Sequence, residues 1–223
     1  MKTKFLMLAA AAGAAAFASP AMAQEAGDIQ LKVVATAVLP EGDIESIPFD
    51  NVPLPADFDT AANDNVVPTL AVEYFLTDSF SIETIAGTTQ HDVDAFAGLP
   101  GAEIVSDGLL LPATFTGKFH FDAGGIKPYV GAGGAYFIWL DADPGAGIVP
   151  LGVTDVNLSD ELGLVLQAGV DVPLGDNGFG LTLDAKRYFI DTTLTVFVDD
   201  TLILETEHSL DPWVLSAGVS FTF

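Results

Sequence analysis

The sequence predicts an all-β protein: an eight-stranded antiparallel up-and-down β-barrel that spans a membrane. Three observations predict it, namely a leader-like N-terminus, a series of segments in which apolar and polar residues alternate, and a C-terminal segment that ends on an aromatic residue. Alternation with a period of two is typical of strands that have one apolar face. In an outer-membrane barrel the apolar face lies against lipid and the other face lines the lumen.

The N-terminal segment 1–23 has the three parts of a secretory signal peptide. Residues 1–4 carry two lysines, 5–18 are apolar, and the small residues Ala21 and Ala23 on either side of Met22 offer a cleavage site. The apolar part is shorter than the roughly 17–25 residues of a membrane helix. We therefore expect a signal peptide at 1–23 and one barrel domain at 24–223, located in the outer membrane of a Gram-negative bacterium.

Charge and composition exclude several classes of protein. The chain has 31 acidic and 7 basic residues, a net charge of −24, and the loss of Lys2 and Lys4 with the leader makes it −26. Such a chain repels nucleic acid, so no nucleic-acid partner is expected. It contains no cysteine, which excludes disulfides and thiolate metal sites.

Eight alternating segments and the connections between them set out the expected barrel. The expected strands are 29–39, 66–76, 80–91, 109–121, 127–140, 162–172, 179–186 and a closing strand that ends at Phe223. The expected short turns are 77–79, 122–125 and 175–178, and the expected long loops are 40–65, 92–108 and 141–160. Residues 199–200 form the tip of the last hairpin. Long loops on one side and short turns on the other are the usual arrangement in outer-membrane barrels.

The inward faces of these strands carry most of the charge that lies outside the loops. The expected lumen-facing side chains are Lys32, Val34, Glu73, Glu83, Ile85, Lys118, His120, Asp171, Asp184 and Lys186. A barrel of eight strands has room only for side chains or one small ligand. The charged residues could therefore form a paired polar plug that seals the barrel, or they could line a narrow conduction path.

No catalytic residue, metal site or cofactor is expected. His91 lies beside Asp92 at a loop edge, where we expect it to be solvated. His208 and Ser209 are neighbours on a strand and point to opposite faces, so they do not share a site. Three histidines without metal-ligand spacing predict no transition-metal site.

The last strand also predicts an assembly signal. Val219, Phe221 and Phe223 lie on one face, outward. We expect the barrel-insertion machinery to recognise this terminal face, and outer-membrane lipid to surround the folded barrel.

Five motifs together resemble the OmpW family of eight-stranded outer-membrane proteins. They are NVVPTLAVEYFLTD at 65–78, LPATF at 111–115, KPYVGAG at 127–133, QAGVD at 167–171 and DPW at 211–213. The resemblance covers nearly all of the chain after the leader. It implies a narrow barrel with a hydrophobic channel that passes small apolar molecules and releases them laterally into the membrane.

Two functional hypotheses follow from the sequence. In the first, the barrel is channel-like and passes small hydrophobic solutes across the outer membrane. In the alternative, it is a non-conducting structural barrel whose acidic extracellular loops bind divalent cations or envelope partners. Neither hypothesis makes the protein an enzyme.

Overall fold

The computed structural model describes residues 24–223, and the predicted signal peptide lies outside this range. Fourteen strands and one 3₁₀ turn make up this part of the chain. They are β1 (Ile29–Leu39), β2 (Asp43–Asp50), β3 (Asp59–Ala62), β4 (Asn65–Thr77), β5 (Phe80–Ala86), β6 (Thr89–Ala97), β7 (Glu103–His120), β8 (Lys127–Pro144), η1 (Val149–Leu151), β9 (Asp155–Leu158), β10 (Glu161–Pro173), β11 (Phe179–Phe189), β12 (Asp191–Val198), β13 (Thr201–Ser209) and β14 (Trp213–Thr222). No helix among residues 24–223 is long and apolar enough to cross a membrane.

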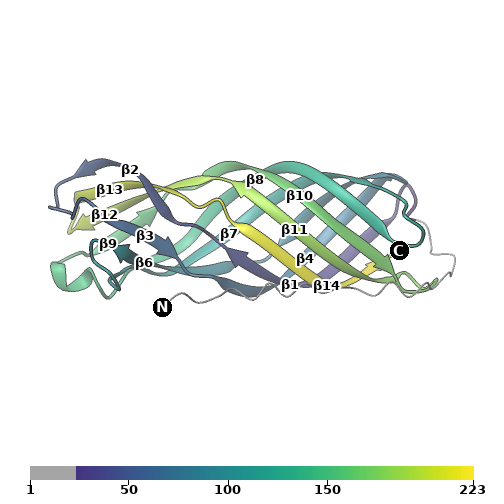
Figure 1. Cartoon of the computed structure of the whole chain (residues 1–223), viewed down its shortest axis with the longest axis horizontal. Helices are drawn as coiled ribbons and strands as arrows, with labels where there is room; N and C mark the ends of the chain where they lie inside the picture. The colour runs from purple at the N-terminus through teal and green to yellow at the C-terminus, as the bar shows by residue number, and fades with distance from the viewer. Residues whose placement is uncertain (1–23) are drawn as a thin grey trace.

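Eight strands close into an antiparallel barrel, which confirms the predicted fold class. The order around the barrel is β1, β4, β5, β7, β8, β10, β11 and β14. The closing strand β14 pairs with β1 from Gln30–Thr222 to Leu39–Trp213, and β7 pairs with β8 on the other side. The strands are tilted along an elongated molecule (Figure 1).

The alternation in the sequence separates the two faces of the wall. On β4, Leu70 and Val72 are 55% and 43% exposed, whereas Glu73 between Val72 and Tyr74 is fully buried. The same pattern runs along β10, where Leu164 and Leu166 are exposed and Gln167 is buried. A row of exposed apolar side chains outside and buried polar ones inside is the pattern of a barrel wall in lipid.

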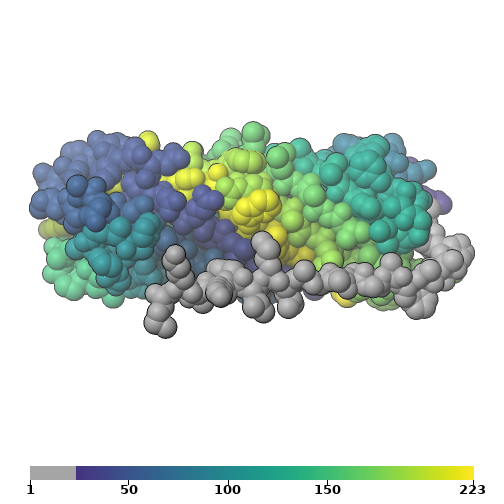
Figure 2. All heavy atoms as spheres, in the orientation of Figure 1, coloured from purple at the N-terminus to yellow at the C-terminus, as the bar shows by residue number. Residues whose placement is uncertain are grey.

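The three predicted long loops are wrong in detail, because much of them is folded into strands. Residues 40–65 contain β2 and β3, residues 92–108 contain the end of β6 and the start of β7, and residues 141–160 contain the end of β8 and β9. With β12 and β13 they form an extension of the barrel, which includes a second sheet in the order β2, β13, β12, β9. Figure 1 shows this extension at the end opposite to the C-terminus, and residues from the first third of the chain cover much of it in Figure 2.

An apolar cluster explains why these acidic, proline-containing segments fold. Its buried members come from five strands and the stretch between β8 and β9: Ala95, Ile104, Val105, Ile148, Val153, Val156, Leu194, Val196 and Leu204. Burial of such side chains is worth roughly 1.5–3 kcal/mol for each large one. The extension therefore has a core of its own, separate from the lipid-facing surface.

The first and last strands of the barrel, β1 and β14, meet at the end of the barrel that lies opposite to the extension. Ile29 and Phe223 exchange two backbone hydrogen bonds, each 3.0 Å long. The tight turns 77–79, 122–125 and 175–178 lie at the same end. Neighbouring strands run antiparallel, so β4, β7 and β10, which precede these turns, end where β1 begins. An even number of strands and short turns on this side identify it as periplasmic.

Candidate lumenal site

The lumen has two parts: a network of charged side chains near the periplasmic end and an apolar cavity nearer the extension. The network comes from inward positions of seven strands, β1, β4, β5, β7, β8, β10 and β11. The cavity lies above it and shares Thr36, Thr69 and Ile85 with a smaller space directly over the network.

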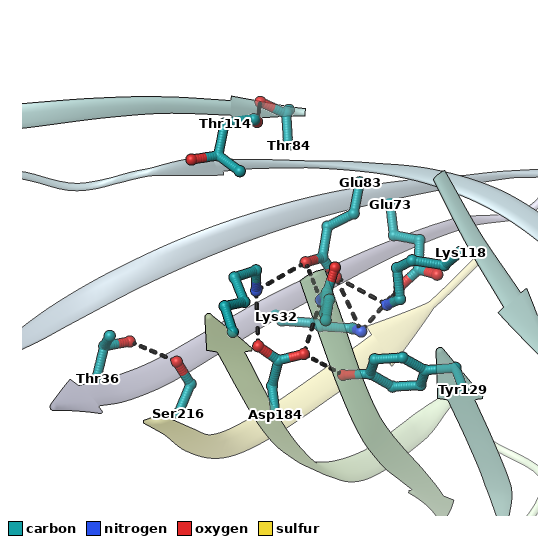
Figure 3. A network of polar contacts seen from close by, with 12 residues as sticks. Lys32, Thr36, Glu73, Glu83, Thr84, Thr114, Lys118, Tyr129, Asp184 and Ser216 are labelled. Carbon is teal, nitrogen blue, oxygen red and sulfur yellow. Dashed lines mark hydrogen bonds and ion pairs between the residues drawn. The ribbon is translucent and has the colours of Figure 1, made fainter. Parts of the chain in front are cut away.

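Two ammonium groups and two carboxylates form the centre of the network (Figure 3). Lys32 Nζ lies 2.7 Å from Glu73 Oε2 and 3.2 Å from Glu83 Oε2. Lys118 Nζ contacts the same two atoms at 2.7 and 2.9 Å. All four side chains are at most 3% exposed, so each charge depends on its partners rather than on water.

A second part of the network joins Glu83 to the far side of the barrel. Lys186 Nζ lies 3.2 Å from Glu83 Oε1 and 2.7 Å from Asp184 Oδ1. Gln167 Nε2 donates hydrogen bonds to Glu83 Oε1 at 2.9 Å and to Asp184 Oδ2 at 2.7 Å. The Tyr129 hydroxyl donates to the same Asp184 oxygen at 2.7 Å.

The periplasmic side of the network holds an acid and a histidine. Asp171 Oδ1 lies 3.5 Å from Lys32 Nζ. His120 Nε2 lies 2.8 Å from Glu73 Oε1 and 2.9 Å from the Ser81 hydroxyl. This continuous arrangement of side chains fills the lumen at its level.

The ten predicted lumen-facing residues all lie on inward positions of their strands. Eight carry the network: Lys32, Glu73, Glu83, Lys118, His120, Asp171, Asp184 and Lys186. Val34 is buried above the network, and Ile85 is partly buried and lines the cavity.

Tyr129 belongs to the network and was missed among the candidate site residues. Lys118 Nζ lies 3.7 Å from the centroid of its ring, close enough for a cation–π contact. Its strand alternates poorly because glycines replace side chains on both faces, which hid the inward position. A signal was present: a Cβ at Gly169 would overlap the Tyr129 ring, so this glycine leaves room for an inward aromatic residue.

The apolar cavity has a volume of about 70 Å³, whereas one water molecule needs roughly 10–15 Å³. Its wall includes most of a buried cluster, with Val38, Leu110, Phe137, Leu210 and Val214. The lining contains no Lys, Arg, Asp or Glu side chain, and its polar groups are mainly threonine hydroxyls and two histidines. The cavity is therefore suited to a slender apolar molecule.

The barrel wall is interrupted beside this cavity. Pairing between β5 and β7 ends at Thr84–Phe115, and pairing between β6 and β7 begins at Thr89–Leu110. Between these points the ladder is absent, and the Thr84 hydroxyl donates to Thr114 O at 3.0 Å (Figure 3). Pro112, which has no N–H to donate, lies on one side of the interruption and lines the cavity.

Two buried histidines lie at the extracellular end of the cavity. His91 Nδ1 lies 2.7 Å from Asn63 O, and its Nε2 lies 2.9 Å from the hydroxyl of Thr89. The expectation that His91 is solvated is wrong: it is 4% exposed, since its strand continues through the segment predicted as a loop. Burial lowers the pKa of His91 below its usual value, although Asp64 and Asp92 act in the opposite direction.

His208 repeats the pattern of His91. It follows Thr206 by two residues, its Nε2 lies 2.6 Å from that hydroxyl, and its Nδ1 lies 3.2 Å from Gly42 O. Burial lowers its pKa as well. Gly42 and Asn63 lie at the two ends of the segment that contains β2 and β3. The two histidines therefore hydrogen-bond to the backbone at both ends of this segment.

Among residues 24–223, no group of three or more His, Asp or Glu side chains is placed to hold a metal ion.

The fold and the lumen define the class of this protein, an eight-stranded barrel of the bacterial outer membrane. The model of the OmpW family matches residues 25–223, and the chain belongs to this family. The chain is 32% identical to the uncharacterized outer-membrane protein y4mB of Sinorhizobium fredii, over 99% of this chain and 97% of the relative. It is 27% identical to outer membrane protein W of Vibrio cholerae, over 94% and 95% of the two chains.

Solved structures share the fold. OprG from Pseudomonas aeruginosa matches with a TM-score of 0.76 and 22% identity, over 90% of this chain and 97% of that one. AlkL in lipid bilayers matches with a TM-score of 0.72 and 20% identity, over 93% and 95%. Outer membrane protein W of E. coli matches with a TM-score of 0.58 and 25% identity, over 89% and 99%.

Proposed function

We propose that this barrel carries small hydrophobic molecules from outside the cell into the outer membrane and is not an enzyme. The single observation that carries the proposal is the uncharged apolar cavity beside an interruption of the barrel wall.

A straight path to the periplasm is unfavourable for an apolar solute. The network of Lys32, Lys118 and Lys186 with their carboxylates fills the lumen below the cavity. Separating one partner of a buried ion pair costs about 3–5 kcal/mol, and an apolar solute offers nothing in exchange. The network therefore acts as the floor of the cavity.

A lateral path is shorter and less costly. Between Thr84 and Thr89 no ladder hydrogen bond to β7 must be broken, and Gly87 and Thr88 on this segment line the cavity. A solute that leaves here enters the lipid beside the barrel. This is the release that the family resemblance implies.

Entry from outside has to pass the apolar cluster of the extension. Val93, Val105, Leu158 and Leu194, which belong to this cluster or pack against it, also line the cavity. An apolar solute that separates these side chains replaces their contacts with similar ones. No ion pair has to be broken at this level, so entry is favoured over passage through the charged floor.

Uptake of the uncharged dye N-phenyl-1-naphthylamine by cells that produce the full chain tests the proposal. Its fluorescence should rise faster than in cells with an empty vector. Ile85→Trp, which fills the cavity, should abolish the difference, whereas Ile82→Trp on the lipid-facing side of the same strand should keep it. Dye entry at the vector rate, for a protein present and folded in the membrane, would reject the proposal. Calcium-dependent clustering of the purified barrel in addition would favour the structural alternative.

A further inference from the structure

The charge of this protein is distributed very unevenly along the barrel. Segments 40–65, 88–112, 138–161 and 190–211, which build the extension and its junction with the barrel, contain 22 of the 31 acidic residues and no lysine or arginine. A solute that approaches the cavity from outside therefore meets no lysine or arginine of these segments, and Arg187 at their edge is paired with Glu41 and Asp211.

Carboxylates also lie near the cavity itself. The carboxylates of Asp64 and Asp92 raise the pKa of His91, and that of Asp59 raises the pKa of His208, against the effect of burial. Both histidines line the extracellular end of the cavity. Asp43 and Asp94 are exposed, and each is the chain neighbour of a cavity-lining residue. The negative potential of the extension thus reaches the region through which a solute has to enter.

The floor of the cavity offers no partner to an anion. Each lysine and arginine among residues 24–223 already contacts at least one carboxylate: Lys32, Lys118, Lys127, Lys186 and Arg187. In the network, three ammonium groups face the four carboxylates of Glu73, Glu83, Asp171 and Asp184. An anionic headgroup would have to displace one of these carboxylates.

We infer that the barrel discriminates by charge, admitting uncharged amphiphiles and rejecting anionic ones such as carboxylates and sulfonates. This inference rests on the proposed function and specifies its substrate class. Three features carry it: entrance segments that contain carboxylates but no lysine or arginine, a cavity without charge, and a floor whose cations are all paired. An anion loses its hydration and gains no counter-charge at any of these places.

A pair of dyes with one ring system tests this inference. N-phenyl-1-naphthylamine is uncharged, and 8-anilino-1-naphthalenesulfonate adds one sulfonate to the same rings. In cells that produce the full chain, the first dye should enter several-fold faster than in vector cells, whereas the second should enter at the vector rate. Because charges at the surface are screened within roughly 8 Å at physiological salt, discrimination should be largest in buffer of low ionic strength.

Charge substitution at the entrance provides the matched variants. Asp43→Lys/Asp64→Lys/Asp94→Lys changes three exposed carboxylates that accept no hydrogen bond from the described residues. It should raise sulfonate uptake several-fold and leave uptake of the neutral dye unchanged. Asp78→Lys/Asp122→Lys/Asp176→Lys makes the same change of net charge at the periplasmic turns and should not raise it.

The outcomes separate this inference from the proposed function. Equal acceleration of both dyes by the unaltered protein would overturn charge discrimination and leave hydrophobic uptake intact. Unchanged sulfonate uptake in the entrance variant, or an equal rise in the turn variant, would also overturn it. No acceleration of the neutral dye would reject the proposed function, and the inference with it.

Discussion

The Lys186 ammonium and the Glu83 carboxylate meet across the lumen, with Nζ 3.2 Å from Oε1, although their strands lie on opposite sides of the barrel. Glu83 also accepts hydrogen bonds from Lys32, Lys118 and Gln167. One carboxylate on β5 therefore joins β1, β7, β10 and β11. The network thus also ties strands that share no backbone pairing, such as β5 with β1 and β5 with β11.

Glu83→Gln should lower the stability of the folded barrel. The amide removes a buried negative charge and leaves three ammonium groups with fewer counter-charges, which costs about 3–5 kcal/mol for a buried pair. The measurement is the temperature at which the folded form converts to the slower unfolded band on SDS gels. Asp176→Asn, a neutralisation in an exposed turn, is the control and should leave this temperature unchanged. Equal conversion temperatures for both variants would contradict the central role of Glu83.

Gly169→Ala should disturb the network without any change of charge. A Cβ at this position would overlap the Tyr129 ring and Leu183 O, so the ring must move away from Lys118. Overpacking of this kind typically costs 1–3 kcal/mol. We expect a lower conversion temperature on SDS gels and a change in Tyr129 signals in NMR spectra. Ala168→Val, on the lipid-facing side of β10, serves as the control, and an unaltered Tyr129 spectrum in Gly169→Ala would contradict the assignment.

Acidification should loosen the extension before it affects the barrel. The pKa values of His91 and His208 are lowered on folding, so the unfolded extension binds more protons than the folded one. Stability therefore falls as the pH drops below about 6.5, the pKa of an unperturbed histidine, and the loss is complete once the folded histidines also titrate. Limited proteolysis of segment 40–65 should be faster at pH 5.5 than at pH 7.5.

The double variant His91→Gln/His208→Gln provides the control for this pH effect. It keeps hydrogen-bonding side chains at both positions but cannot titrate. Its proteolysis rate, corrected for the pH dependence of the protease, should be the same at both pH values. Asp43 and Asp191, whose pKa values are raised by burial, act in the opposite direction and stabilise the folded extension on acidification. An equal pH effect in this variant would therefore contradict the assignment to the two histidines.

Removal of Phe223 should reduce assembly in cells. Its backbone N–H donates to Ile29 O, and its ring stacks on Phe221 with centroids 5.9 Å apart on the lipid-facing surface. We expect less folded protein in the outer membrane and more periplasmic degradation, measured by fractionation and heat-shift gels. Phe119→Leu, at another exposed aromatic position, should assemble normally. Normal assembly of the truncated chain would show that Val219 and Phe221 suffice or that the signal lies elsewhere.

The sequence by itself determined the barrel and the inward side of its strands. Alternation such as that of Leu70, Val72 and Glu73 is a local property, because neighbouring residues on a strand must point to opposite faces. For the same reason, the inward positions of Lys118 and His120 could be read from their own strand. Glycines and prolines in 127–133 weakened the pattern, and Tyr129 was missed there.

Only the tertiary structure decided which inward residues meet and where apolar space remains. The contact of Lys186 with Glu83 depends on the tilt and stagger of strands four places apart, which no single segment encodes. The burial of His91 and the folding of the predicted loops depend on apolar side chains that gather from several segments into one cluster. Alternation is fixed by the geometry of one strand. The charged network, the cavity and the interruption of the wall depend instead on how all eight strands pair to close the barrel.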